Sequence, residues 1–332
     1  SNDVVYDTIT VDTSSNNTVT LETVSGGYRA MINAIEWVVV SNGGGNTTPS
    51  EPSLPSSEPS SSEEPSSSEP SSYVPSSSTD YEGSYYNSIT ATSENALLGQ
   101  VRDLIVGTHT KYTSYDDCRG GSSGYAGDTD KDLNNPNNII LFYCKQSIKN
   151  GWDGGSTWNR EHVWPKSIGL WSESVGGSDL HHIRPSDPKI NSTRGNKKYG
   201  EVTSGTAVIG NNGMLGGYYS GNVFEPLDNV KGDAARIILY MFTHYNSPDY
   251  IKTNSNKTDN CPTTKTCGTS GNLPITNVIN GSKNEAFNLL IDWHENDPVD
   301  DQEIYRNDQV FNIQGNRNPF IDHPEYVRAI WG

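Results

Sequence analysis

A stretch of proline, serine and glutamate at residues 43–80 divides this chain into two unequal parts. Seven of the 18 prolines lie there, spaced by serine and glutamate in a loose SSEP repeat. Large apolar side chains are almost missing, so the stretch cannot bury enough surface to offset the entropy lost on ordering. We predict a flexible linker over residues 43–80, which confines any stable core to the residues before and after it.

The residues before the linker, 1–42, read as β-structure. The segments TVTLETV and MINAIEWVVV alternate or run apolar with β-branched residues, and the turn signal SGG separates them. A segment of about 40 residues is too small for a self-sufficient β domain. We expect a short β-rich segment, compatible with the end of a larger β-sandwich that serves in binding or anchoring.

The residues after the linker, 81–332, combine helix and strand patterns. Apolar residues recur at helical spacing in three segments, and the continuous apolar run NNIILFYC is typical of a buried strand. The three helical segments are ENALLGQVRDLIVGTH with Ser93 as N-cap, VKGDAARIILYMFTHY with Asp228 as cap, and NEAFNLLIDWHEND. We therefore expect one α+β domain over residues 81–332, with long irregular loops. No apolar run is long enough for a transmembrane helix.

The distribution of charge is uneven. The net charge of the chain is -17, which by itself argues against a polyanionic partner. Residues 159–200, however, hold seven bases and four acids, a local net charge of +3. A nucleic-acid partner, contacted through its backbone phosphates, is therefore compatible with this part of the chain.

The four cysteines favour disulfides over zinc. Cys261 and Cys267 enclose a short loop, NCPTTKTCG, and Cys118 with Cys144 is the natural second pair. No CxxC motif occurs and no histidine lies at ligand spacing from a cysteine. Two disulfides beside a serine- and proline-rich tract indicate an extracellular protein.

Residues 159–196 carry the side chains best suited to chemistry. The motifs NREHVWPKS and SDLHHIRPSDPKINSTRGN contain three of the seven histidines. A neutral imidazole such as His162 can take a proton from water near neutral pH. Glu161 and Asn191 supply a carboxylate and an amide oxygen, which are ligands that Mg²⁺ prefers, with Ca²⁺ or Mn²⁺ as substitutes. This set suits metal-assisted attack on a phosphodiester.

The spacing within this block predicts its geometry. Successive strand residues point to opposite faces, so the strand that carries Glu161 and His162 must bend or end there for both to reach one site. A helix beginning near Pro188 places Asn191 and Arg194 on one face. Asp179 and His181 would share one side of a strand, with one of His181 and His182 buried and its neighbour exposed. The isolated histidines are expected to be structural: His109, His244, His294 and His323.

The same residues resemble the bacterial endonuclease I family of secreted or periplasmic nucleases, within the broader His-Me finger (ββα-metal) superfamily. Family-like signatures run in order from about Tyr85 to the C-terminus: NREHVWPKS, DLHHIRPSDPKINSTRGNKKYG, VKGDAARIILYM, WHENDPV and RNDQVFNIQGNRNPFIDHPE. The resemblance implies an α+β body around a ββα-metal motif, with His162 as general base and Glu161 with Asn191 as metal ligands. It implies supporting roles for His181 and Asp179.

The resemblance also implies arginines at the substrate. Arg194 and Arg317 match family arginines that act as phosphate contacts or structural braces. Some relatives carry a further arginine between the EH and DLH motifs, but WSESVGGSD has no base there. The contact with the scissile phosphate therefore falls to Arg184, Arg194 or Arg160.

The function so predicted is a secreted or cell-surface bacterial endonuclease. The resemblance implies metal-dependent, sequence-nonspecific cleavage of DNA, and of RNA as well, that leaves 5′-phosphate ends. Contacts with phosphate explain the lack of sequence preference, because the nucleic-acid backbone carries no direct sequence information. The alternatives are a non-catalytic nucleic-acid-binding or surface adhesion module, and a hydrolase of small phosphoesters.

Overall fold

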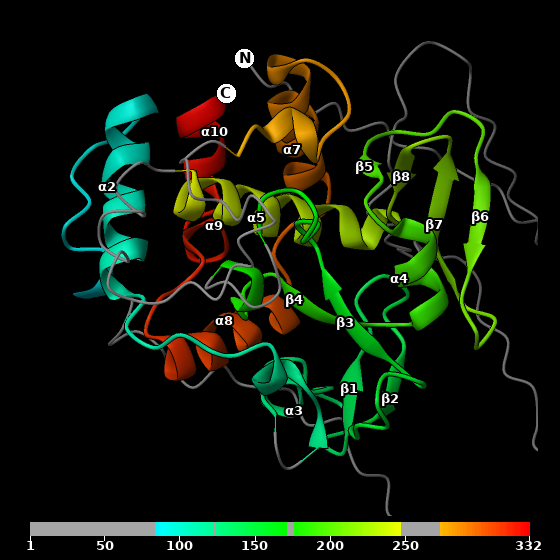
Figure 1. The fold of residues 1–332 in the computed structure, drawn as a ribbon. Helices are drawn as coiled ribbons and strands as arrows, with labels where there is room; N and C mark the ends of the chain where they lie inside the picture. Colours follow the sequence, from blue (N-terminus) through cyan, green and yellow to red (C-terminus); the bar gives the residue numbers. More distant parts are fainter. Residues whose placement is uncertain (1–83, 122–123, 171–175, 247–272) are drawn as a thin grey trace, which may run out of the picture. The chain divides into compact units, whose positions relative to one another are not determined.

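The structure is a computed structural model that describes residues 84–121, 124–170, 176–246 and 273–332 (Figure 1). The predicted β-rich segment (1–42) and linker (43–80) lie outside these residues, as do Cys261 and Cys267. The described part contains both helices and small sheets, which confirms a mixed α+β architecture.

A central helix, α5 (Asp228–Tyr245), organises the helical part of the domain. Almost all of its side chains are buried, and it packs against α2 (Glu94–Thr108) and α7 (Lys283–Asn296). The other helical elements are α3 (Ala126–Thr129), α8 (Asp301–Gln314), α9 (Pro319–Asp322), α10 (Glu325–Trp331) and the 3-10 turns η1 (Asp116–Cys118), η3 (Gly176–Ser178) and η4 (Ile275–Asn277). Among the described helices, none combines the length and apolar character needed to cross a membrane.

The three predicted helices are confirmed, with differences at their first turns. Leu97, Val101 and Ile105 of α2 are fully buried, as their spacing predicted. Ser93 is the N-cap of α2, although its side chain makes no capping hydrogen bond. Asp228 is the first residue of α5, whose N-cap is Leu227, so the predicted cap was wrong by one position.

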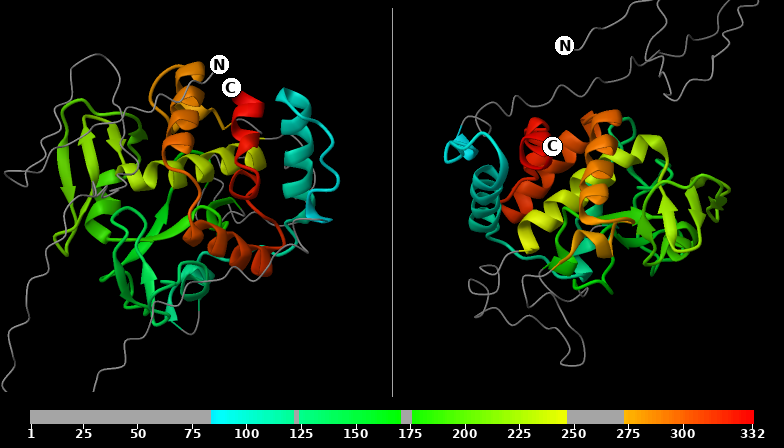
Figure 2. Two further views of the ribbon diagram at one scale, coloured as in Figure 1. Left: turned by 180° about the vertical axis from the view of Figure 1, so that it is seen from behind. Right: turned by 90° about the horizontal axis from the view of Figure 1, so that it is seen from above.

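The strands form three small sheets (Figure 2). Two of the sheets are antiparallel pairs, and the third has four strands in the order β5-β8-β7-β6. Within the four-stranded sheet only β5 and β8 run parallel. The strands are β1 (Asn138–Ile140), β2 (Ser147–Lys149), β3 (Asn159–His162), β4 (Ile183–Ser186), β5 (Lys198–Tyr199), β6 (Thr206–Ile209), β7 (Leu215–Ser220) and β8 (Val223–Glu225). Figure 1 shows β3 and β4 beside α4 (Pro188–Arg194).

The predicted strand over residues 137–144 is shorter than expected. Only Asn138–Ile140 pairs with β2, because the chain then turns and Leu141 N donates to Gln146 O at 2.8 Å. The following residues, Leu141 to Cys144, are nevertheless buried in the main core. Continuous apolar character therefore indicated burial correctly but overestimated the length of the strand.

The unit β3-β4-α4 positions the predicted chemistry. Strands β3 and β4 pair antiparallel, with Glu161 opposite Arg184, and β3 ends at His162 as predicted. Helix α4 begins at Pro188, also as predicted, because Asp187 caps it by accepting from two backbone amides at 2.8 and 3.1 Å. The helix ends at Arg194, and its C-cap is Gly195, whose φ of 55° favours glycine.

The predicted disulfide between Cys118 and Cys144 is wrong. Both residues are buried free cysteines. Cys118 belongs to a small cluster with Leu180, Ile183 and Val310, whereas Cys144 belongs to the main core. The two thiols therefore lie in different clusters, and the spacing of the cysteines in the sequence could not indicate this.

Candidate active site

A cleft of about 470 Å³ lies where the end of β3 meets α4. Three of the predicted site residues, Glu161, His162 and Asn191, line it together. The described residues that line it are Tyr115, Trp152, Gly154, Gly155, Asn159, Arg160, Glu161, His162, Pro165, Lys166, Ser167, Asn191, Ser192, Gly195 and Asn196. The fold therefore brings together residues from a strand, from loops and from a helix, as the sequence pattern predicted.

Glu161 is a buried carboxylate held by internal partners. Its Oε1 accepts a hydrogen bond from the Tyr143 hydroxyl at 2.6 Å and faces Arg194 Nη1 at 3.1 Å. Both contacts use Oε1, which leaves Oε2 without a side-chain partner among the described residues. Burial raises the pKa of the Glu161 carboxyl, and Arg194 and Tyr143 oppose this rise only in part. A cation at Oε2 would favour the ionised form.

Asn191 has its amide group fixed in one orientation. Its Nδ2 donates to Asn159 Oδ1 at 2.7 Å and to the carbonyl oxygen of Arg160 at 3.2 Å. Both partners are acceptors, so the nitrogen must face them and the oxygen must face away. The Oδ1 atom makes no hydrogen bond with a described residue, and it is the natural ligand atom of this side chain for a hard cation.

His162 is a buried imidazole with one nitrogen uncommitted. Its ring stacks on Tyr115 at 5.2 Å and meets the ring of His182 edge-on at 5.5 Å. Burial, reinforced by His182, lowers the pKa of His162 well below its ordinary value, so the ring is neutral near pH 7. The ring hydrogen-bonds the backbone of Gly177, and its Nε2 has no hydrogen-bond partner among the described residues. A neutral ring held this way can accept a proton at Nε2.

Arg160 is the arginine whose side chain lines the cleft. Its guanidinium lies over the Tyr115 ring at 3.6 Å and near the Trp152 ring at 5.0 Å, and it donates to the Tyr115 carbonyl oxygen. Asp116 Oδ1 lies 3.6 Å away but is largely exposed. Lys166 adds a second positive charge to the same lining. The cleft therefore presents cationic groups beside the Glu161 and Asn191 oxygens.

Arg194 and Arg184 lie outside the cleft lining. Arg194 is fully buried, and besides Glu161 it donates to the carbonyl oxygens of His162 at 3.0 Å and Val163 at 2.7 Å. Arg184 is buried on β4, where its Nε donates to Asp130 Oδ1 at 2.7 Å. These contacts favour positioning roles, in which Arg194 fixes the end of β3, over direct contact with a phosphate.

His181 also lies away from the cleft. Its Nε2 is 3.1 Å from the carbonyl oxygen of Asn316, and its ring packs on Tyr240. Residues 179–182 form a turn before β4 rather than a strand, so the predicted shared strand face of Asp179 and His181 was wrong. His181 and His182 are both buried, which corrects the expectation that one of them would be exposed.

Arg317 acts as a brace. It is buried and pairs with Asp322 at 2.6 Å and with Asp308 at 2.8 Å. These contacts tie α9 to α8, remote in the chain from β3, so the geometry supports the bracing reading of this arginine.

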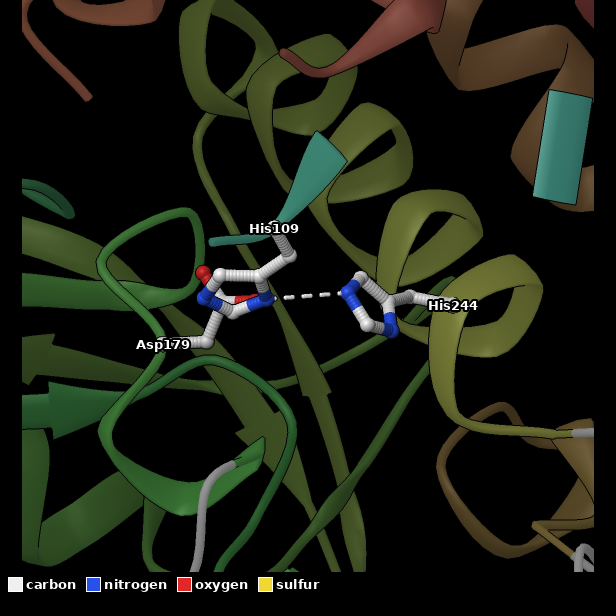
Figure 3. Close-up of side chains that lie close together, drawn as sticks. All are labelled: His109, Asp179 and His244. Carbon is white, nitrogen blue, oxygen red and sulfur yellow. Dashed lines mark hydrogen bonds and ion pairs between the residues drawn. The ribbon is translucent and has the colours of Figure 1, made fainter. Parts of the chain in front are cut away.

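Asp179 forms the centre of a second buried cluster with His109 and His244 (Figure 3). One ligand atom from each of the three residues lies within 4.8 Å of the other two, and His109 Nδ1 is 3.0 Å from His244 Nε2. His109 and His244, which stand alone in the sequence, are therefore in contact in the fold. Their sequence positions, 135 residues apart, gave no sign of this contact.

Hydrogen bonds already fill the acceptor capacity of Asp179. Its Oδ1 accepts from His181 N at 2.8 Å and Gln314 Nε2 at 2.9 Å, and its Oδ2 accepts from the hydroxyls of Tyr240 at 2.8 Å and Tyr245 at 2.6 Å. An ionised carboxylate has about four acceptor sites. The two imidazoles and one carboxylate are of types that can hold a metal, but the geometry favours a structural hydrogen-bond centre.

Buried histidines make the fold sensitive to acid. Burial lowers the pKa of His181 and of His182 to about 4 and that of His244 to about 3. In the unfolded chain the pKa is about 6.5, so between about pH 6.5 and about pH 4 the unfolded state binds more protons. Stability should therefore fall as the pH falls through this window, by up to about 1.4 kcal/mol per pH unit for each histidine.

Urea unfolding followed by circular dichroism from about pH 7 to about pH 4 measures this dependence. The variant His182→Gln should show a shallower slope than the parent, because it removes one titrating group. An unfolding free energy that stays constant over the window would contradict the prediction.

Several residues in or behind the cleft were not found from the sequence. Asn159 had a usable signal, because it lies two positions before Glu161 on the same face of β3. Tyr115 and Tyr143 had none, since Tyr115 comes from a loop and Tyr143 belongs to a segment that indicated only burial. Long-range packing brings Tyr115 to the cleft wall and the Tyr143 hydroxyl to Glu161.

Comparisons with known proteins agree with this site. The Endonuclease I family model matches residues 86–325. Extracellular ribonucleases of Bacillus amyloliquefaciens and Bacillus subtilis (strain 168) are 38% and 37% identical over 260 and 254 residues, covering 76% and 75% of this chain and 80% and 78% of theirs. Endonuclease-1 of Buchnera aphidicola subsp. Acyrthosiphon pisum (strain APS) is 25% identical over 144 residues, 43% of this chain and 44% of its own.

The cleft and these matches together define a class of enzyme. A carboxylate, an amide and a neutral histidine stand beside cationic groups, and the matched region contains all of them, so the protein is a nucleic-acid hydrolase. The chain belongs to the Endonuclease I family, whose model matches well over half of its residues.

Proposed function

We propose that this protein is an extracellular, divalent-metal-dependent endonuclease that cleaves DNA and RNA with little sequence preference. The observation that carries the proposal is the single cleft shared by Glu161, His162 and Asn191. The pairing of β3 with β4, followed directly by α4, supports assigning this unit as the ββα-metal motif of His-Me finger nucleases.

The proposal divides the chemistry between a base and cationic groups. His162 Nε2 takes a proton from the attacking water, because the ring is neutral and this nitrogen is uncommitted. Arg160 and Lys166 hold the scissile phosphate from the wall of the cleft. Arg194 positions the base, since it binds the carbonyl oxygen of His162 and the carboxylate of Glu161. The product ends are proposed to carry 5′-phosphates.

The residues present fit a divalent cation. Glu161 Oε2 and Asn191 Oδ1 are oxygen atoms without side-chain partners, on side chains that other contacts hold in place. We assign these two as the side chains that would hold Mg²⁺, with Ca²⁺ or Mn²⁺ as substitutes. Such an ion supplies positive charge beside the scissile phosphate and the leaving oxygen.

The substrate and the location follow from different observations. Contacts of Arg160 and Lys166 with phosphate would be blind to base sequence. Two relatives are named extracellular ribonucleases, which supports action on RNA outside the cell. DNA is included in the proposal because both polymers carry the phosphate backbone that these groups would contact. Residues 81–332 would form the nuclease domain. Residues 43–80 would separate it from the β-rich segment 1–42.

A cleavage assay tests this function. Plasmid DNA and a long RNA are incubated with the full chain and Mg²⁺, with and without a chelator. We expect fragments of both substrates only when the ion is present. Intact plasmid and intact RNA under every metal condition would favour the binding-module alternative. Cleavage of a small phosphate ester with both polymers left intact would favour the small-phosphoester hydrolase.

The metal ligands are tested by Glu161→Gln. Removing one of two protein ligands and its negative charge should weaken binding of Mn²⁺ by at least about tenfold, measured by calorimetric titration. Glu325→Gln, a largely exposed residue on α10, is the matched control and should titrate like the parent. Identical titrations for Glu161→Gln and the parent would remove Glu161 from the ligand set.

A further inference from the structure

A second cavity continues the active-site cleft along the domain. It has a volume of about 440 Å³ and shares Ser167 and Asn196 with the first. Beyond these two residues, the polar side chains that the described residues contribute to it are Lys198, Asn222 and Asn277. Because the two cavities share part of their walls, one polymer strand can occupy both at once.

The charge of this second cavity differs from that of the whole protein. The chain has a net charge of -17, yet among the described residues no carboxylate lines the cavity, and Lys198 is the one charged side chain there. Lys198 forms no ion pair with a described residue. In the neighbouring cleft, Glu161 is the only carboxylate that the described residues contribute, and it is buried against Arg194. The combined groove therefore favours an anion along its length.

The walls of the second cavity are held by backbone hydrogen bonds. Lys198 N donates to Asn222 O at 2.9 Å, which ties β5 to the turn before β8. Tyr199 N donates to Val278 O at 2.8 Å, which ties β5 to the residues after η4. The side chains of Asn196, Asn222 and Asn277 make no hydrogen bonds with described residues. Their amides, which donate and accept, are thus available on a preformed wall.

We infer that this second cavity is a subsite for the nucleotide next to the scissile bond on a single strand. Lys198 binds its phosphate, and the three asparagines bind its phosphate and sugar oxygens. The inference rests on the proposed function, because it takes the first cleft as the place where the nucleic-acid strand is cut. Within the part of the chain that the structure describes, no aromatic side chain lines the cavity, so these walls offer no base-stacking platform and contact the nucleic-acid backbone instead.

Binding to a fluorescent single-stranded oligonucleotide about twelve nucleotides long, with chelator present to prevent cleavage, tests the subsite. Lys198→Met should raise the Kd roughly three- to tenfold and reduce the slope of log Kd against log salt concentration by about 0.7. Asn277→Asp adds a negative charge to the cavity and should also weaken binding relative to the parent. Lys149→Met, an exposed lysine of β2 outside both cavities, is the matched control.

Cleavage of a dinucleotide separates the subsite from the catalytic cleft. A dinucleotide has one phosphate and cannot fill both cavities, so Lys198→Met should impair kcat/KM for the longer strand several times more than for the dinucleotide. An unchanged Kd and salt slope in Lys198→Met, or equal impairment with both substrates, would overturn the inference. A parent enzyme that cleaves neither substrate contradicts the proposed function, while the binding data still decide the subsite.

Discussion

His162→Ala is expected to slow phosphodiester cleavage by about two to four orders of magnitude while the protein stays folded. The imidazole is neutral, and its Nε2 is the one ring nitrogen without a hydrogen-bond partner among the described residues. Removing it takes away the group that accepts the proton from water. Glu161 and Asn191 keep their contacts, so the Mn²⁺ titration of the variant should match that of the parent.

Adding imidazole to the assay distinguishes a catalytic role of His162 from a structural one, because free imidazole would not repair a structural defect. Imidazole can enter the space left by the ring, so it should restore part of the rate to His162→Ala. His323→Ala removes a histidine of the C-terminal region, where its ring faces Glu325, and should keep the parent rate. A variant at position 162 that retains a rate within about tenfold of the parent would move the base elsewhere. His182 would then be the next candidate, since its ring lies 5.5 Å from that of His162.

The local parts of the site could be predicted from the sequence. The end of β3 at His162 and the start of α4 at Pro188 follow from strand alternation and helix capping, which depend on neighbours in the chain. The predicted ligands and base therefore reach one cleft. The roles of arginines could not be predicted in this way, because Arg184 and Arg194 are buried against partners, Asp130 and Glu161, that are distant in sequence.

Contacts between residues distant in sequence also explain the errors in the predicted fold. The helical stripes of α2, α5 and α7 predicted their own burial, because apolar periodicity reports a face of a helix. The pairing of Cys118 with Cys144 failed because neither sequence spacing nor composition states which cluster a buried thiol joins. The contact of His109 with His244 links the end of α2 to α5, and only the packing of these two helices creates it.

Asp179 connects that helical packing to the cleft. It receives donors from α5 and α8, and its backbone oxygen accepts from His182 N and Ile183 N, both at 3.2 Å, at the start of β4. Burial raises the pKa of the Asp179 carboxyl, but His109, His181, His244 and the Tyr245 hydroxyl outweigh it, so the pKa lies well below its ordinary value. The ionised form is therefore favoured in the folded state. Its contribution to the free energy of unfolding is lost at low pH.

Asp179→Ala should lower the free energy of unfolding by about 3 to 5 kcal/mol, a large part of the stability of a typical domain. The substitution leaves four donors without their acceptor inside the core, including the hydroxyls of Tyr240 and Tyr245. Tyr245→Phe removes only one of these donors and should cost about 1 to 2 kcal/mol. Asp103→Ala, an exposed aspartate of α2, should change stability by less than about 0.5 kcal/mol. Urea unfolding near pH 7 measures all three variants, and a parent-like midpoint for Asp179→Ala would show that this hydrogen-bond centre does not stabilise the fold.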